Sequence, residues 1–199
     1  MINKIVIFLA AGAALSLSAG VPRSAMPDTR SGEKYVSEGN YFKCVLPKDW
    51  RKVDSMGQPA SEKKVYGVDI VGPAGTDGIA PSISVEYYAK GNTLFKSASE
   101  FVRMNSKPIP GLALAGDKYS SVTTIKIAGR KATRFERRSS DFVKPRQVEN
   151  KQIAVFERYI VLPAGEGFYA LSYYCVFSEA KAKLPVFEAV VKSFEPLVK

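Results

Sequence analysis

The sequence predicts an α+β protein in which helices cover a largely antiparallel sheet. Most of its apolar segments are short or alternate with polar residues, which is typical of strands, and turn-forming residues join several of them in pairs. One amphipathic helical segment follows the third of these strands, and a second lies near the C-terminus. Because strands that are joined by hairpins pair antiparallel, the two helices are expected to cover one continuous sheet.

The first three strands end at turn-forming residues. Residues 41–46 are aromatic and apolar, and a proline and an aspartate stop this run before Trp50. Residues 65–71 form the second run, which a Gly-Pro-Ala-Gly sequence ends. In residues 82–88 apolar and polar side chains alternate, as they do in a strand whose two faces have different surroundings.

A capping box predicts the first helix. Ser97 stands three residues before Glu100, so the serine hydroxyl and the glutamate carboxylate can both accept hydrogen bonds from backbone N–H groups at the helix start. The apolar residues that follow supply one side of the helix. It should end before Pro108.

Two pairs of segments predict hairpins, and they bring the number of strands to about seven. Residues 119–127 and 130–138 flank an Ala-Gly pair, in which Gly129 supplies the positive φ that a tight turn needs. Residues 153–162 and 168–177 form the second pair, and a glycine-containing loop joins them.

The second helix is predicted from apolar residues at helical spacing. These are Ala180, Leu184, Phe187, Val191 and Phe194. Ser178 is the candidate N-cap, and Pro196 ends the segment. Pro185 lies inside the pattern, so the main helix either begins there after a lead-in turn or is kinked there.

Residues 1–20 have the order of a secretory signal peptide. Lys4 is followed by an apolar run over 5–17 and then by small residues up to Gly20, after which we expect cleavage. The alternative is an uncleaved membrane anchor, but the run is shorter than the 20 or so residues that span a bilayer. No cysteine lies near the junction to carry a lipid. The expected location is therefore the periplasm or the external medium.

The rest of the chain is expected to form one domain. Residues 21–34 contain prolines and polar residues without an apolar pattern, which predicts a flexible tether. Residues 35–199 then contain all of the predicted strands and both helices, and no linker divides them. The polar residues 139–151 are expected to form a long loop.

The composition excludes several classes of enzyme. The 199 residues include 29 Lys and Arg against 19 Asp and Glu, a net charge of +10, and no histidine. Without histidine the chain can form neither a Ser-His-Asp nor a Cys-His catalytic system, and it cannot bind zinc or haem through imidazole. The acidic residues do not follow a metal-binding spacing. We therefore expect no enzymatic activity, no metal and no cofactor.

Four segments resemble those of PsbP-like domains, the superfamily that includes PsbP of photosystem II and the Ran-binding Mog protein. Residues 41–50 resemble the opening strand with its proline turn and tryptophan, and residues 127–132 resemble the central hairpin. Residues 167–173 resemble the penultimate strand, and residues 187–194 resemble the closing helix. The resemblance covers about residues 38–196. It implies an α/β/α sandwich around an antiparallel sheet, in proteins that act by binding rather than by catalysis.

The two cysteines are candidates for a disulfide. Cys44 lies in the first predicted strand and Cys175 in the last, and an exported protein meets an oxidising compartment. Both also alternate with aromatic and aliphatic neighbours, as small buried core residues do. A disulfide and two separate buried thiols are both compatible with this pattern.

A group of cations on one strand and the loop after it is the candidate binding surface. Its members are Arg130, Lys131, Arg134, Arg137, Arg138, Lys144 and Arg146. Strand alternation places Arg130, Arg134 and Arg138 on one face and Lys131 and Arg137 on the other. Such a surface fits an anionic partner. The alternative is an edge strand whose charges prevent it from pairing with other chains.

These inferences predict an exported, non-enzymatic binding or accessory protein of the cell envelope. The expected partner is an envelope protein, held by the loop over residues 139–151, and not nucleic acid, since no nucleic-acid-binding module is present. The alternative is a periplasmic carrier of a small molecule or metal ion, with a pocket between sheet and helix. No stable membrane insertion is expected once the signal peptide is removed.

Overall fold

The computed structural model describes residues 32–53, 60–75, 78–108, 116–142 and 152–199. Their strands are β1 (Glu33–Val36), β2 (Phe42–Leu46), β3 (Arg51–Val53), β4 (Val65–Val71), β5 (Ser82–Tyr88), β6 (Lys118–Tyr119), β7 (Thr123–Ile127), β8 (Arg130–Phe142), β9 (Gln152–Ala164), β10 (Gly167–Val176) and β11 (Glu195–Pro196). Their helices are α1 (Ala60–Lys63), α2 (Ala98–Asn105) and α3 (Ala180–Ser193), with short 3-10 turns at η2 (Glu38–Asn40) and η3 (Phe177–Glu179). None of these helices is long and apolar enough to cross a membrane.

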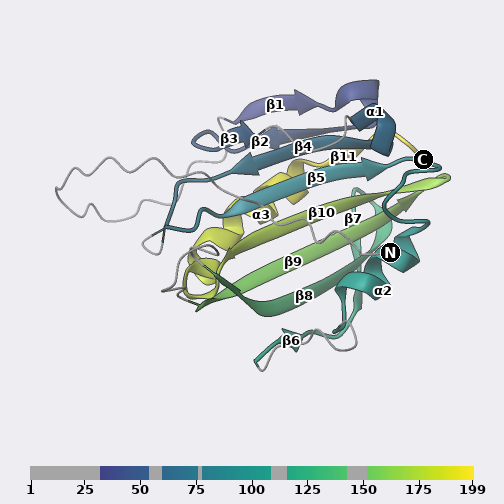
Figure 1. Ribbon diagram of the computed structural model, residues 1–199. Coiled ribbons are helices and arrows are strands. Elements are labelled where there is room, and N and C mark those ends of the chain that lie inside the picture. The colour runs from purple at the N-terminus through teal and green to yellow at the C-terminus, as the bar shows by residue number, and fades with distance from the viewer. Residues whose placement is uncertain (1–31, 54–59, 76–77, 109–115, 143–151) are drawn as a thin grey trace.

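The strands form a large and a small sheet, and every strand pair is antiparallel. The large sheet has the order β3-β4-β5-β10-β9-β8-β6, and β7 also pairs with β8 (Figure 1). The small sheet has the order β1-β2-β11. The α+β class and the largely antiparallel sheet are therefore confirmed.

The main core lies between one face of the large sheet and a layer made of α3 and the small sheet. Phe42 of β2, Leu171 of β10 and Phe187 of α3 are fully buried in it. Ser193 at the end of α3 fixes this layer, because its Oγ accepts a hydrogen bond from the backbone N–H of Val45 in β2 at 2.9 Å. The small sheet is thus part of the layer that the α/β/α prediction assigned to helix alone.

A second, aromatic core lies under α2 on the opposite face of the large sheet. Phe101 of α2 packs edge-on against Tyr88 of β5, with ring centroids 5.7 Å apart. Tyr88 in turn stacks on Phe168 of β10 at 4.6 Å. Alternation along the strands separates the two cores, since neighbouring residues point to opposite faces of a sheet.

Local sequence patterns predicted the positions of most of the longer helices and strands. The predicted strands over 65–71 and 82–88 coincide with β4 and β5. The predicted strand over 119–127 is divided into β6 and β7. The short strands β1, β3, β6 and β11 were not predicted as separate strands, because two to four residues carry too little alternation to be recognised.

The capping box of α2 is confirmed. The backbone N–H of Glu100 donates to the Oγ of Ser97 at 3.1 Å, and the backbone N–H of Lys96 donates to the Glu100 carboxylate at 2.6 Å. The cap that we expected from Ser178 is wrong. Helix α3 begins at Ala180, after η3, and no side chain caps its first turn, since the carboxylate of the N-cap residue Glu179 instead forms an ion pair with Lys183.

Two predicted boundaries shift. Strand β8 continues to Phe142, so residues 139–142 belong to the sheet and not to the predicted loop. Their backbone pairs with β9, and the Asp141 carboxylate accepts a hydrogen bond from the Tyr174 hydroxyl at 2.7 Å, which no local pattern could reveal. At the other end, β1 begins at Glu33, just inside the segment that we assigned to the tether. The predicted signal peptide and residues 143–151 lie outside the described residues.

Candidate binding surface

Three of the arginines predicted to form a binding surface make contacts within the molecule. Arg130 binds two carbonyl oxygens, that of Val198 at 2.7 Å and that of Pro163 at 2.5 Å. It therefore ties the C-terminal end of the chain to β9. A guanidinium group with both of its ends bound in this way is poorly placed to hold a partner.

Arg137 and Arg138 are also occupied. Arg137 makes two hydrogen bonds to the Glu157 carboxylate, one of them at 2.7 Å, and the Tyr159 hydroxyl donates to the same carboxylate at 2.7 Å. The Arg138 guanidinium lies 3.8 Å from the centre of the Phe177 ring, within the range of a cation–π contact. The partners of both arginines come from distant parts of the sequence.

Two of the predicted cations have no such partner among the described residues. Lys131 and Arg134 form no ion pair with a described acidic residue. Lys144 and Arg146 lie outside the described residues. The predicted alternation of the strand is confirmed by its surroundings, because Ala132 belongs to the main core and Phe135 to the core under α2.

Strand β8 is not an edge strand, which was the alternative explanation for its charges. It pairs with β9 along one side and with β7 and β6 along the other. The pairing with β7 places Lys126 directly opposite Lys131. Directly opposite residues have Cβ atoms about 5 Å apart on one face of the sheet, and like charges there are destabilising. We call Lys126 and Lys131 the lysine pair; neither forms an ion pair with an acid among the described residues.

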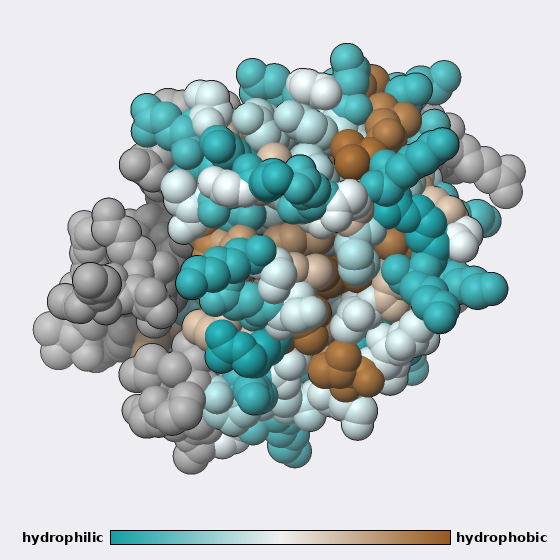
Figure 2. All heavy atoms as spheres, turned by 90° about the vertical axis from the view of Figure 1, so that its right-hand side faces the viewer, coloured by the Kyte–Doolittle hydropathy of each residue, from teal (hydrophilic) through white to brown (hydrophobic). Residues whose placement is uncertain are grey.

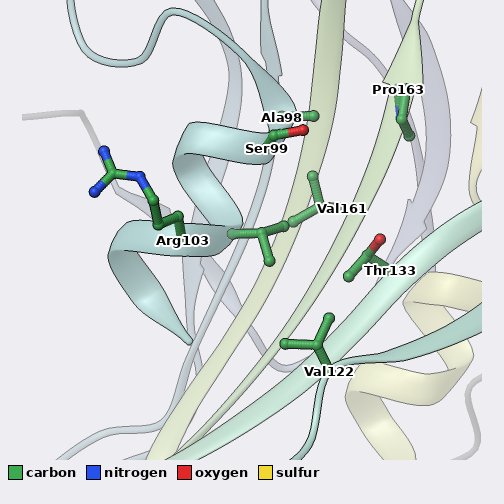
Figure 3. A pocket seen from close by; sticks show the side chains of 8 residues that line it. Ala98, Ser99, Arg103, Val122, Thr133, Val161 and Pro163 are labelled. Carbon is green, nitrogen blue, oxygen red and sulfur yellow. The ribbon is translucent and has the colours of Figure 1, made fainter. Parts of the chain in front are cut away.

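An open groove lies beside the lysine pair, between α2 and the sheet. It has a volume of about 280 Å³ and is lined by Ala98, Ser99, Val102, Arg103, Val122, Thr133, Val161 and Pro163. In Figure 3, Val122 and Thr133 lie across the cavity from α2, and the Arg103 side chain is directed away from them. We call this cavity the α2 groove. Thr133 and Lys131 are two residues apart on β8, so the groove and the lysine pair share one face of the sheet.

A second hollow continues past the start of α2. It has a volume of about 470 Å³, and Ala98, Ser99 and Pro163 line both cavities. Phe95 and Phe168 supply its apolar wall. Figure 2 shows this end of the molecule, where brown apolar groups are exposed among teal polar and charged ones. The sequence did not predict either hollow, because both depend on how α2 sits on the sheet.

The two cysteines are buried free thiols in the structure. They lie in different sheets but belong to the same main core. Burial raises the pKa of the Cys44 thiol to about 12, and burial also raises the pKa of Cys175. Neither thiol is therefore ionised or accessible as a nucleophile at neutral pH.

Three tyrosine–carboxylate pairs on the α2 side of the large sheet were missed by the sequence analysis. In each pair the tyrosine hydroxyl donates at 2.7 Å, and the pairs are Tyr88 with Glu86, Tyr159 with Glu157, and Tyr174 with Asp141. Two of them could have been found, because a glutamate two residues before a tyrosine lies on the same face of a strand. The carboxylates are satisfied within the molecule, and no cluster suited to a metal ion occurs among the described residues.

Among known proteins, the chain is similar to solved structures that share its fold. No protein-family model and no curated protein matches the chain. The solution structure of cyanobacterial PsbP (CyanoP) from Synechocystis sp. PCC 6803 is 14% identical, covers 87% of this chain and 98% of its own, and has a TM-score of 0.51. LpqN, involved in cell envelope biogenesis of Mycobacterium tuberculosis, is 14% identical and covers 84% of this chain and 86% of its own, with a TM-score of 0.47.

A third structure is longer than this chain. The crystal structure from Bacteroides thetaiotaomicron VPI-5482 is 16% identical and covers 83% of this chain, with a TM-score of 0.47. The chain spans about half of that structure's length, 48%. At these identities the similarity concerns the fold alone. The sheet order, the covering helices and the likeness to CyanoP together establish that the chain has the PsbP-like fold, as the four sequence segments implied.

Proposed function

We propose that the chain is an exported, non-enzymatic binding protein of the cell envelope that holds an acidic protein partner at the lysine pair and the α2 groove. The observation that carries this proposal is the lysine pair itself. Two cations stand directly opposite each other without an acid to pair with among the described residues. An anionic partner would replace this repulsion with two attractive contacts.

The apolar lining of the groove supports a protein partner. Val122 is 49% exposed and lines the groove together with Val102 and Val161, so an apolar side chain of a partner could be buried among three valines. Apolar contacts next to charges of one sign are typical of interfaces, in which the apolar centre supplies affinity and the charged rim supplies orientation.

A binding role also agrees with the reactive groups that the chain has. It contains no histidine, and both thiols are buried. The carboxylates of the three tyrosine–carboxylate pairs are held by hydrogen bonds and, for Glu157, by Arg137. These groups are fixed by the fold rather than directed into the α2 groove.

The alternative function, a small-molecule carrier, is favoured by one observation, since the α2 groove does lie between sheet and helix. Carriers enclose most of the surface of their ligand. The groove is instead bordered by the exposed Val122 and by Arg103, whose side chain is 57% exposed. An open groove of this kind suits a segment of a larger partner better than a small ligand.

The proposal is tested by placing a photo-crosslinking amino acid at Val122 of the full chain in its native host. Val36 of β1 is the matched control, because it is also an exposed valine, 46% against 49%, but belongs to the small sheet. We expect one crosslinked protein from position 122 and none from position 36. In the double variant Lys126→Glu, Lys131→Glu the crosslink should be lost. Equal labelling at both positions, or labelling that the double variant leaves unchanged, would contradict the proposal.

The proposed export has its own test. Fractionation of the host should recover the protein outside the cytoplasm, and its mass should correspond to a chain that begins at Val21. A cytoplasmic protein that keeps Lys4 would show that the N-terminal segment is not a signal peptide.

A further inference from the structure

Strand β7 has one free edge among the described residues. It pairs with β8 along one side, and no backbone hydrogen bond joins it to any other described segment. An unpaired strand edge presents a row of N–H and C=O groups that a further strand can use. Natural proteins often complete such an edge with an extended segment of a partner.

The register shows which groups face outward. The turn between β7 and β8 has two residues, so Ile127 and Arg130, which flank it, exchange both of their backbone hydrogen bonds. This pattern alternates along the strand, so Ile125 also pairs inward. The backbone N–H and C=O groups of Thr124 and Lys126 therefore face away from β8.

The side chains along this edge differ between the two faces of the sheet. Ile125 and Ile127 are partly buried and pack against the main core. Thr124 and Lys126 are exposed on the opposite face, the one that carries the lysine pair. A strand placed beside β7 would therefore meet the apolar Ile125 and Ile127 on one face, and Thr124 and the cation Lys126 on the other.

We propose that an extended segment of the partner, with alternating apolar and acidic side chains, adds as a strand to the free edge of β7. Its apolar residues extend the main core beside Ile125 and Ile127, and its acidic residues lie next to Lys126, on the face that also carries Lys131 one strand further in. This inference rests on the proposed function, because the segment belongs to the same partner. A second copy of this chain is a poor occupant, since pairing two β7 edges brings two lysine pairs onto one face.

The first test uses hydrogen exchange of the ¹⁵N-labelled protein as its host produces it. The probe is a short blocked peptide of alternating glutamate and valine, and a lysine–valine peptide is the control. On binding of the acidic peptide, exchange at the amides of Thr124 and Lys126 should slow at least about tenfold, while Ile125 and Ile127, already bonded to β8, should change little. No binding, or binding without protection at Thr124 and Lys126, would overturn strand addition.

The second test is the variant Thr124→Pro. It removes an outward N–H without touching a hydrogen bond to β8, and it leaves the lysine pair intact. Affinity for the acidic peptide should fall by about tenfold, whereas the matched variant Thr124→Ala should bind within about twofold of the original chain. Suppose that Thr124→Pro and Thr124→Ala bind the peptide equally well while the double lysine variant loses the crosslink at Val122. Strand addition to β7 is then refuted, and the proposed function stands. If the double variant keeps the crosslink, the proposed function fails as well.

Discussion

Glu86 is the residue at which the stability of the molecule should respond most directly to pH. The pKa of this carboxyl group is raised from 4.5 to about 7, chiefly by burial and secondly by the nearby Asp69 carboxylate, while the hydrogen bond from Tyr88 and the charge of Lys63 oppose the shift. The folded protein therefore holds a proton on Glu86 that the unfolded chain releases at lower pH. The stability that this proton contributes is fully present below the pKa of Glu86 in the unfolded chain. It is lost as the pH rises through the pKa of Glu86 in the folded protein.

This linkage predicts the effect of Glu86→Gln. The amide cannot ionise but can still accept the Tyr88 hydrogen bond, so the variant should not lose stability between pH 5 and pH 8 through this site. The original chain should lose about 2 kcal/mol more than the variant across this range. The free energy of unfolding is measured in urea at both pH values. Glu166→Gln, at an exposed ion pair, is the control and should leave the pH dependence unchanged. A parallel pH dependence in Glu86→Gln and the original chain would show that Glu86 does not titrate in this window.

Arg137 is a cation whose importance is structural. Its two hydrogen bonds hold the Glu157 carboxylate, which is only 8% exposed. Removal of one partner from a buried ion pair leaves the other charge uncompensated. Arg137→Ala should therefore destabilise the fold by about 3 kcal/mol, measured by denaturant unfolding. Arg134→Ala, on the same strand but without an ion pair to a described acid, should change the stability by no more than about 0.5 kcal/mol. Equal losses of stability in the two variants would show that the ion pair of Arg137 with Glu157 does not stabilise the fold.

At the scale of elements, the β7–β8 hairpin decides the binding surface, because its turn sets the register that brings Lys126 opposite Lys131. Both turn residues have positive φ, +47° at Ala128 and +75° at Gly129. Glycine adopts this conformation without cost, whereas alanine is strained by roughly 1 kcal/mol. The turn that sets the register of β7 against β8 therefore contains one strained residue, Ala128.

The strain at Ala128 predicts a stabilising substitution. Asparagine tolerates positive φ, and Asn-Gly is the preferred pair for this kind of two-residue turn. Ala128→Asn should therefore stabilise the protein by about 0.5–1 kcal/mol, and Gly129→Ala should destabilise it by about 1 kcal/mol. The denaturation midpoints of the two variants test this. If Ala128→Asn lowers the midpoint, the turn does not have the conformation described.

The elements also show where the sequence was sufficient. Strand β4 and the cap of α2 carry their signals within a few consecutive residues, and both were located correctly. The end of β8 depends on pairing with β9 and on a hydrogen bond from Tyr174, so its polar residues resembled a loop. The start of α3 was missed for a related reason, since η3 occupies the position where Ser178 was expected to cap the helix.

At the scale of the whole molecule, the binding surface was only partly predictable. The sequence located the cations of β8, but their roles depend on Glu157, Phe177 and the carbonyl of Val198, which lie far along the chain. Lys126 could have been included, because the Ala-Gly turn alone determines that it faces Lys131. The α2 groove could not, since it arises only when a helix from one region settles over strands from another.

The two cysteines provide a test of how the layers hold together. Cys44 belongs to β2 of the small sheet and Cys175 to β10 of the large sheet, and both are buried in the core between them. If the layers unfold as one unit, a thiol reagent should modify neither residue in the native protein and both at the same urea concentration. The fraction labelled, followed by mass spectrometry, should match the unfolding curve. The single variants Cys44→Ala and Cys175→Ala assign each signal. Labelling of Cys44 at lower urea would mean that the small sheet detaches first, and two unreactive sulfurs in the unfolded, unreduced protein would mean that the cysteines are joined in a disulfide.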